Sequence, residues 1–73
     1  MRVELVTRAG CHLCDEALRT LQALGVDPVL RDVDSDEQLF RLYDWRVPVV
    51  LVDGTPVAEG KIDVARLGRA LAE

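Results

Sequence analysis

The chain has 73 residues, 49% of them hydrophobic and 30% charged, and it carries a formal net charge of −4 at pH 7. This length suffices for a single domain, expected to span residues 1–73, with one small core. The acidic balance argues against a nucleic-acid partner, and no apolar run approaches the roughly 20 residues that cross a bilayer, so no membrane partner is expected.

The first third of the sequence predicts a strand, a helix and a second strand. Residues 2–7 are rich in Val and Leu and predict a short strand. Apolar residues then recur at helical spacing, and Gly25 is typical of the position that ends a helix. The apolar stripe consists of Ala17, Leu18, Leu21 and Leu24. A second strand is predicted over 29–33, which gives a unit of two parallel strands joined by a helix.

A second helix is expected to begin at Ser35. Its hydroxyl would accept from a backbone N–H three residues on, and Gln38 would reach back, as in a capping box. The buried side of this helix is predicted to consist of Leu39, Phe40, Leu42 and Tyr43.

The last third predicts a hairpin and a terminal helix. Residues 49–52 read as a strand, and Asp53-Gly54 is a strong signal for a two-residue hairpin turn. Pro56 places the next strand at the sheet edge, because proline cannot donate to a ladder. Asp63 is expected to cap the terminal helix, whose apolar stripe is Val64, Leu67 and Leu71.

The only two cysteines, Cys11 and Cys14, lie where the first strand runs into the first helix. Exposed N–H groups and the helix dipole favour a thiolate at such a point. The pKa of a free cysteine is about 8.5, and settings of this kind lower it to roughly 3.5–7.5. Cys11, at the tip of the turn, is predicted to attack disulfides, and Cys14, one turn deeper, to resolve the mixed disulfide.

Charged neighbours are expected to tune this pair. A protonated His12 would favour the Cys11 thiolate, whereas Asp15 and Glu16 in the first helical turn oppose it, so only a modest lowering of the Cys11 pKa is predicted. The alternative for His12 is a spacer that faces solvent.

Two arginines are expected to flank the cysteines. Arg8 and Arg46 would offer charge-assisted contacts to a carboxylate or a thiolate, unless they are simply solvated surface. Trp45 is interpreted as a core plug beneath the turn that contains Pro48, or else as part of a docking surface for a partner.

The element order β-α-β-α-β-β-α predicts an α/β fold, a three-layer sandwich with a four-stranded mixed sheet. The first strand is central and helices cover both faces. A CxxC motif after the first strand is where the thioredoxin/glutaredoxin-like architecture places its redox site.

Five motifs along the chain carry a resemblance to a known family. They are Thr7-Arg8-Ala9-Gly10-Cys11-His12-Leu13-Cys14-Asp15-Glu16, Arg31-Asp32-Val33-Asp34, Arg46-Val47-Pro48-Val49-Val50, Asp53-Gly54 and Gly60-Lys61-Ile62-Asp63. With these motifs the chain resembles, over essentially its whole length, small bacterial glutaredoxin-like proteins of the thioredoxin superfamily.

The resemblance implies that Pro48 follows a cis peptide bond and that the backbone of Val47 pairs with the cysteinyl part of a thiol substrate. It also implies that Arg8 meets a carboxylate of glutathione, with Gly60 and Asp63 as candidates for its γ-glutamyl end.

The resulting hypothesis is a monomeric thiol–disulfide oxidoreductase that serves cell redox homeostasis. Its substrates would be protein or small-molecule disulfides, with glutathione or a flavin-dependent reductase as the electron source and no bound cofactor. Met1-Arg2-Val3-Glu4 carries an acid where a signal peptide would be apolar, so a cytoplasmic location is expected. Structural disulfides are rare in that compartment, which favours a catalytic or metal-binding role for the cysteines.

Two alternatives remain open on the sequence. A metal or iron–sulfur protein would use the Cys11-Cys14 pair as ligands, and a dimer sharing two such pairs would supply four. A non-enzymatic binding module would keep the fold and leave the cysteines without a role.

Overall fold

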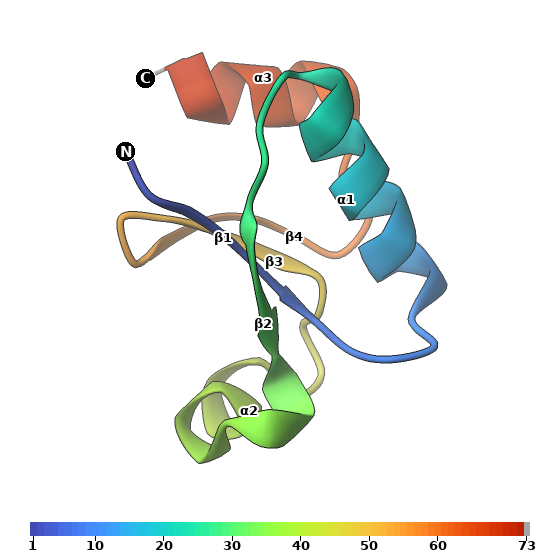
Figure 1. The fold of residues 1–73 in the computed structure, drawn as a ribbon, viewed down its shortest axis with the longest axis vertical. Helices are drawn as coiled ribbons and strands as arrows, with labels where there is room; N and C mark the ends of the chain where they lie inside the picture. Colours follow the sequence, from blue (N-terminus) through green and yellow to red (C-terminus); the bar gives the residue numbers. More distant parts are fainter. Residues whose placement is uncertain (73) are drawn as a thin grey trace.

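Four strands form one mixed sheet in the order β2–β1–β3–β4, with β1 inside it as predicted (Figure 1). The computed structural model describes residues 1–72. β1 (Val3–Thr7) runs parallel to β2 (Val29–Asp32) and antiparallel to β3 (Val49–Val52). β4 (Thr55–Glu59) pairs antiparallel with β3 and forms one edge of the sheet.

Helices cover both faces of this sheet and make three layers (Figure 1). α1 (His12–Ala23) and α3 (Val64–Ala72) lie on one face. A short 3-10 helix, η1 (Val33–Ser35), and α2 (Glu37–Tyr43) lie on the other. The element order is the predicted one with η1 added. Within residues 1–72 no helix combines the length and the apolar character that a membrane crossing requires.

The core has two halves because successive side chains of a strand point to opposite faces. Leu5 and Val50 face α1 and α3, whereas Val6 and Val49 face α2. The first half contains Val3, Leu5, Ala17, Leu21, Val50, Ala58 and Leu67. The second contains Val6, Val33, Tyr43, Val49 and Leu51.

The turns follow the local sequence signals. Asp53 and Gly54 both have positive φ, 51° and 84°, which the tight hairpin between β3 and β4 requires. Gly25 has a φ of 78° directly after the end of α1. These turn predictions are confirmed.

The terminal helix begins as predicted. The carboxylate of Asp63 accepts a hydrogen bond from the backbone N–H of Arg66 at 2.7 Å. Leu67 is fully buried and Leu71 packs against the first core half. Val64, in the first turn of α3, is half exposed.

The predicted start of α2 is wrong. Asp36, not Ser35, caps the helix, and its carboxylate accepts from the N–H of Leu39 at 3.0 Å. The Ser35 hydroxyl instead donates to the Asp32 carboxylate at 2.9 Å within η1. The capping box with Gln38 therefore does not form, because the Ser35 hydroxyl is bound to Asp32 and the N-cap position is one residue later, at Asp36.

The predicted buried side of α2 is too wide. Tyr43 is buried and Leu39 partly buried, but Phe40 and Leu42 are about half exposed, at 45% and 50%. Only one side of this 7-residue helix packs against the sheet. Leu39 and Tyr43 are four residues apart and therefore lie on that same side. Trp45 is 94% exposed, so its interpretation as a core plug is also wrong.

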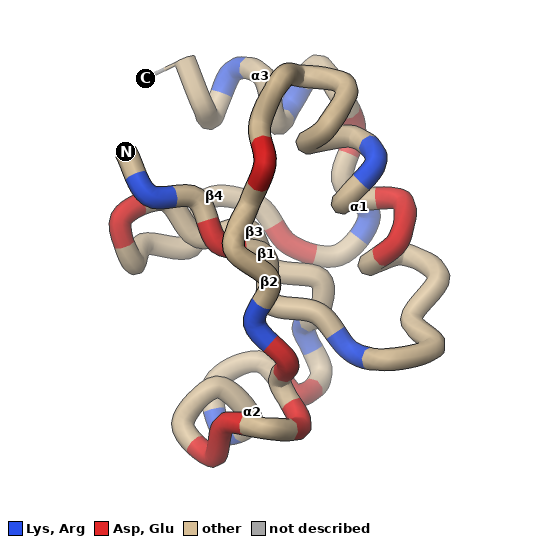
Figure 2. The backbone as a smooth tube through the Cα atoms, viewed as in Figure 1, with Lys and Arg blue, Asp and Glu red and all other residues tan. Residues whose placement is uncertain are grey.

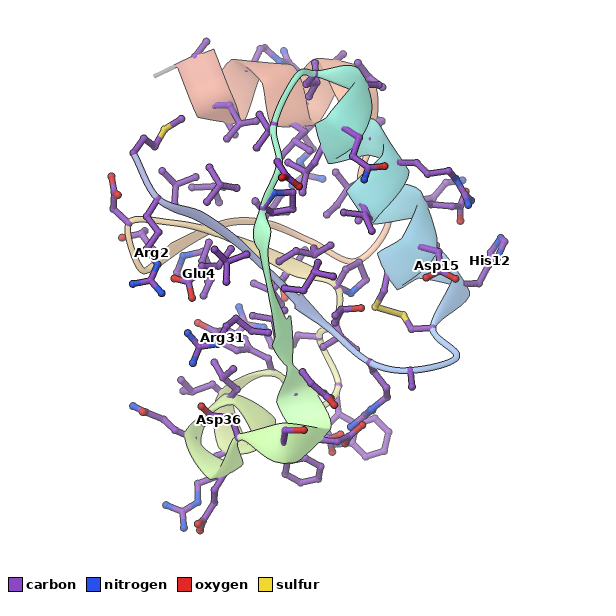
Figure 3. All side chains as sticks on the ribbon, in the orientation of Figure 1. Arg2, Glu4, His12, Asp15, Arg31 and Asp36 are labelled. Atoms are coloured by element: carbon purple, nitrogen blue, oxygen red, sulfur yellow. A yellow bond between two sulfur atoms is a disulfide. The ribbon has the colours of Figure 1, made fainter. Side chains whose placement is uncertain are left out.

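A buried carboxylate sits in the middle of the sheet. Glu4 of β1 is 8% exposed and accepts from the Arg31 guanidinium of β2 at 2.9 Å. Arg31 also reaches the capping carboxylate of Asp36 at 3.4 Å, and Arg2 lies 3.7 Å from Glu4 (Figure 3). This network joins two strands to the start of α2.

Candidate redox site

Cys11 and Cys14 are joined by a disulfide at the start of α1, with their Cα atoms 5.2 Å apart (Figure 3). Cys11 is the N-cap residue of the helix, with φ −89° and ψ 108°, and its side chain is partly exposed. Cys14 lies one turn further on and is 1% exposed. The difference in depth between the two sulfurs agrees with the roles predicted for them.

The backbone of the first helical turn faces the outer sulfur. The N–H of Cys14 lies 3.2 Å from the Cys11 sulfur, and that of Asp15 donates to the Cys11 carbonyl at 3.2 Å. A thiolate at Cys11 would therefore meet an N–H donor and the positive end of the helix dipole. The predicted lowering of the Cys11 pKa stays a prediction, because a disulfide does not titrate.

His12 points away from the sulfurs into solvent (Figure 3). Its side chain is 83% exposed, and its Nε2 lies 3.4 Å from the carboxylate of Glu16, one turn further along α1. Asp15 projects from the same first turn and directly follows Cys14 in the chain. His12, Asp15 and Glu16 therefore all lie near the start of α1, and the imidazole of His12 is close to the carboxylate of Glu16.

Arg8, three residues before Cys11, is bound by two carboxylates of the same chain. It donates to both oxygens of Asp34 at 2.9 and 2.8 Å, and to the carboxylate and the backbone carbonyl of Asp44. The hydrogen bonds with Asp34 and then Asp44 raise the pKa of Arg8, and Arg8 in turn lowers the pKa of Asp34. These contacts tie the loop before Cys11 to η1 and to the end of α2.

Pro48 lies beside the end of β1 and follows a cis peptide bond from Val47, which confirms that prediction. In the β1–β3 ladder Val6 stands opposite Val49, so Pro48 comes next to the point where β1 runs into the Cys11 loop. The Pro48 carbonyl accepts from the N–H of Gly60 at 2.9 Å. Gly60, with a φ of 70°, thus belongs to the same end of the sheet.

Arg46 is also paired within the chain. Its guanidinium donates to both oxygens of Glu59 at 2.6 and 3.2 Å and lies 5.2 Å from the centre of the Tyr43 ring. The hydrogen bonds with Glu59 raise the pKa of Arg46 and lower that of Glu59. Asp63, a predicted substrate contact, is engaged as the cap of α3.

Acid should weaken the fold through these pairs. The pKa values of Asp34 and Glu59 are lowered in the folded state, whereas the pKa of a carboxyl group in the unfolded chain is roughly 4. Their contribution is present above that pH and disappears as the pH falls through the folded values. The free energy of unfolding in urea should therefore drop from pH 7 towards acid, and Asp34→Asn should reduce the drop slightly, since the pair is exposed. If the free energy of unfolding fell equally steeply with pH in Asp34→Asn, the ion pair of Asp34 would not contribute to the acid sensitivity.

Within the described residues, no three side chains of the His, Cys, Asp and Glu types converge to hold a metal ion. One chain offers the two sulfurs of Cys11 and Cys14, and His12 faces Glu16 instead. The site is therefore a disulfide-linked cysteine pair, and the two arginines predicted to flank it, Arg8 and Arg46, are paired with carboxylates of the same chain. The substrate-binding roles predicted for seven residues stay predictions: Arg8, His12, Arg46, Val47, Pro48, Gly60 and Asp63.

Comparison with known protein families finds a match to the model of the glutaredoxin-like domain (DUF836) over residues 2–72. Among curated proteins, uncharacterized proteins from Mycobacterium bovis and Mycobacterium tuberculosis are 38% identical over 80 residues. The matches cover 97% of this chain and 82% of each relative.

Solved structures show the same architecture. A protein of X. campestris, XcR50, superposes with a TM-score of 0.84 at 33% identity, covering 96% of this chain and 95% of that one. The thioredoxin-like protein BC3987 superposes with a TM-score of 0.74 at 27% sequence identity, and the match covers 94% of this chain and 99% of that one. A glutaredoxin from Archaeoglobus fulgidus superposes with a TM-score of 0.72 at 20% sequence identity, and the match covers 99% of this chain and 87% of that one. At this identity the likeness supports the fold alone. The predicted fold class is confirmed.

Proposed function

The chain belongs to the glutaredoxin-like family, and from this membership we propose that it is a thiol–disulfide oxidoreductase. The observation that carries the proposal is the disulfide between a partly exposed Cys11 and a buried Cys14 at the start of α1. A reactive sulfur needs access to its substrate, and a resolving sulfur needs only access to the first.

The proposed reaction passes two electrons from the dithiol to a substrate disulfide. The Cys11 thiolate attacks one sulfur of the substrate, forms a mixed disulfide and releases the other sulfur as a thiolate that takes up a proton. Cys14 loses its proton and attacks the Cys11 sulfur. The second substrate thiol leaves, and the Cys11–Cys14 disulfide closes.

An external thiol must then return two electrons to the protein. We propose either glutathione or a flavin-dependent reductase as donor, in a reducing compartment such as the cytoplasm. Both sulfurs come from one chain, so a monomer suffices for the cycle.

Turnover with a neutral disulfide tests the proposal. The protein should reduce 2-hydroxyethyl disulfide catalytically when supplied with glutathione and glutathione reductase, or with thioredoxin reductase and NADPH. Mild oxidation of the reduced protein should lower its mass by the two hydrogens of one intramolecular disulfide. A protein that forms no such bond, or that turns over with neither donor, would not be an oxidoreductase of this kind.

A further inference from the structure

Both arginines predicted to flank the redox site already have anionic partners within the chain. Arg8 is held by Asp34 and Asp44, and Arg46 by both carboxylate oxygens of Glu59. An anionic substrate that approached Cys11 would have to displace one of these carboxylates to gain an arginine. Such a displacement breaks the internal ion pair, and this loss offsets what the new pair contributes.

Acidic groups outnumber basic ones in the segments that meet at the end of the sheet next to Cys11. Residues 8–16, 44–48 and 59–63 meet at this end of the sheet, through β1, the Pro48 turn and the bond between Gly60 and Pro48. The fixed cations of these segments are Arg8, Arg46 and Lys61, and their carboxylates are Asp15, Glu16, Asp44, Glu59 and Asp63.

Asp15 is the acid that directly follows Cys14 in the chain, in the first turn of α1 (Figure 3). Its side chain is exposed, and it projects from the first turn of α1. Figure 2 shows acidic and basic stretches interleaved along the backbone, without an extended basic run. The whole chain adds a net charge of −4, which acts on approaching ions in the same direction.

We propose that this site selects disulfides that carry positive charge, such as those flanked by basic residues, and disfavours anionic ones such as glutathione disulfide. The inference rests on the proposed function and names the substrate class of the same reaction. The chemistry is unchanged: one disulfide is reduced to two thiols as the Cys11–Cys14 dithiol becomes a disulfide. The charges act on the encounter with the substrate and on its placement over Cys11.

A series of small disulfides of different charge tests this. The reduced protein is mixed with cystamine (two positive charges), 2-hydroxyethyl disulfide (neutral) or glutathione disulfide (net negative) at pH 7 and low salt. The appearance of the oxidised protein is followed by acid quenching and mass spectrometry. Each rate constant is divided by that of dithiothreitol with the same disulfide, which removes the intrinsic reactivity of the substrate.

The corrected rates should fall in the order cystamine, 2-hydroxyethyl disulfide, glutathione disulfide. The ratio of the first to the last should be about tenfold at low salt and should approach one near molar salt, where the Debye length is about 3 Å. A ratio of one or less at low salt, or a ratio insensitive to salt, would overturn the inference.

Two variants of equal charge change localise the effect. Asp15→Asn should lower the ratio of the cystamine rate to the glutathione disulfide rate by about twofold to threefold at low salt, because it removes the charge that directly follows Cys14 in the first turn of α1. Asp27→Asn removes an exposed carboxylate beyond the other end of α1 and should leave the ratio near the parental value. Equal effects of the two variants would contradict a local origin.

Failure of this inference is distinguishable from failure of the proposed function. If none of the three disulfides converts the reduced protein to the Cys11–Cys14 disulfide form while all three oxidise dithiothreitol, the oxidoreductase proposal falls. If all three do so without dependence on charge, only the selectivity falls.

Discussion

Cys14→Ser should convert the protein into a trap that keeps its substrates on Cys11 as mixed disulfides. The buried Cys14 sulfur is the group expected to attack that intermediate, so its loss leaves the covalent adduct in place. Cys11→Ser should lose disulfide reduction by at least about 10³-fold, because a serine hydroxyl is scarcely ionised at neutral pH. Non-reducing gels and intact mass after incubation with a disulfide measure both outcomes.

The two variants are matched controls for each other. Each lacks the internal disulfide and leaves one thiol, so a difference in trapping reflects the position of that thiol rather than the loss of the bridge. Circular dichroism should show the parental fold in both. Equal trapping by Cys11→Ser and Cys14→Ser would reject the assigned roles, since it would mean that the two sulfurs are equally accessible.

Arg31→Met should lower the free energy of unfolding by about 2–3 kcal/mol, because it leaves the buried Glu4 carboxylate without its closest partner. Arg2, at 3.7 Å from Glu4, supplies only partial compensation from an exposed side chain. A domain of 73 residues has a total stability of roughly 4–11 kcal/mol, so the loss is a large fraction of it. Urea denaturation at pH 7 measures the change.

Arg41→Met is the control. Arg41 and its partner Glu37 are exposed on α2, with side-chain exposures of 75% and 80%, so the variant should change stability by less than about 0.5 kcal/mol. The double variant Glu4→Met/Arg31→Met removes both charges and should recover a good part of the stability lost by Arg31→Met alone. Equal losses in Arg31→Met and Arg41→Met would show that Glu4 does not depend on Arg31.

Three sets of contacts between segments distant in the sequence stabilise the loops around the cysteine pair. Arg8 fixes the loop before Cys11 to η1 and α2, and Arg46 fixes the Pro48 turn to β4. The N–H of Gly60 adds a backbone bond to the Pro48 carbonyl. The arginines therefore serve the architecture of the site directly, and their charge is largely balanced before any substrate arrives.

Several features of the fold follow from local sequence alone. Asp53-Gly54 predicts the hairpin turn because few residues tolerate positive φ in succession, and Asp63 predicts the cap of α3. The Cys11-Cys14 spacing at the start of a helix predicts a dithiol pair with an outer and an inner sulfur. In each case the interacting groups are within a few residues of one another.

Predictions failed where neighbours compete or where an element ends early. Ser35 and Asp36 are both good helix caps, and only the side chain of Asp32, which binds the Ser35 hydroxyl, decides between them. The apolar character of Phe40, Leu42 and Trp45 suggested burial. Which side chains of a short helix are buried depends on how the helix packs against the sheet, and the sequence of the helix alone does not determine this packing.

The sequence by itself determined the order of the elements, the turns and the identity of the redox pair, because these depend on contacts between residues close together in the chain. The tertiary structure alone decided which charges meet. Arg8 reaches Asp34 and Asp44 across 26 and 36 residues, and Arg31 reaches Glu4 across 27. A chain with many acids allows many such pairings, and only the packing of β1 against η1, α2 and β2 brings these particular groups within hydrogen-bonding distance.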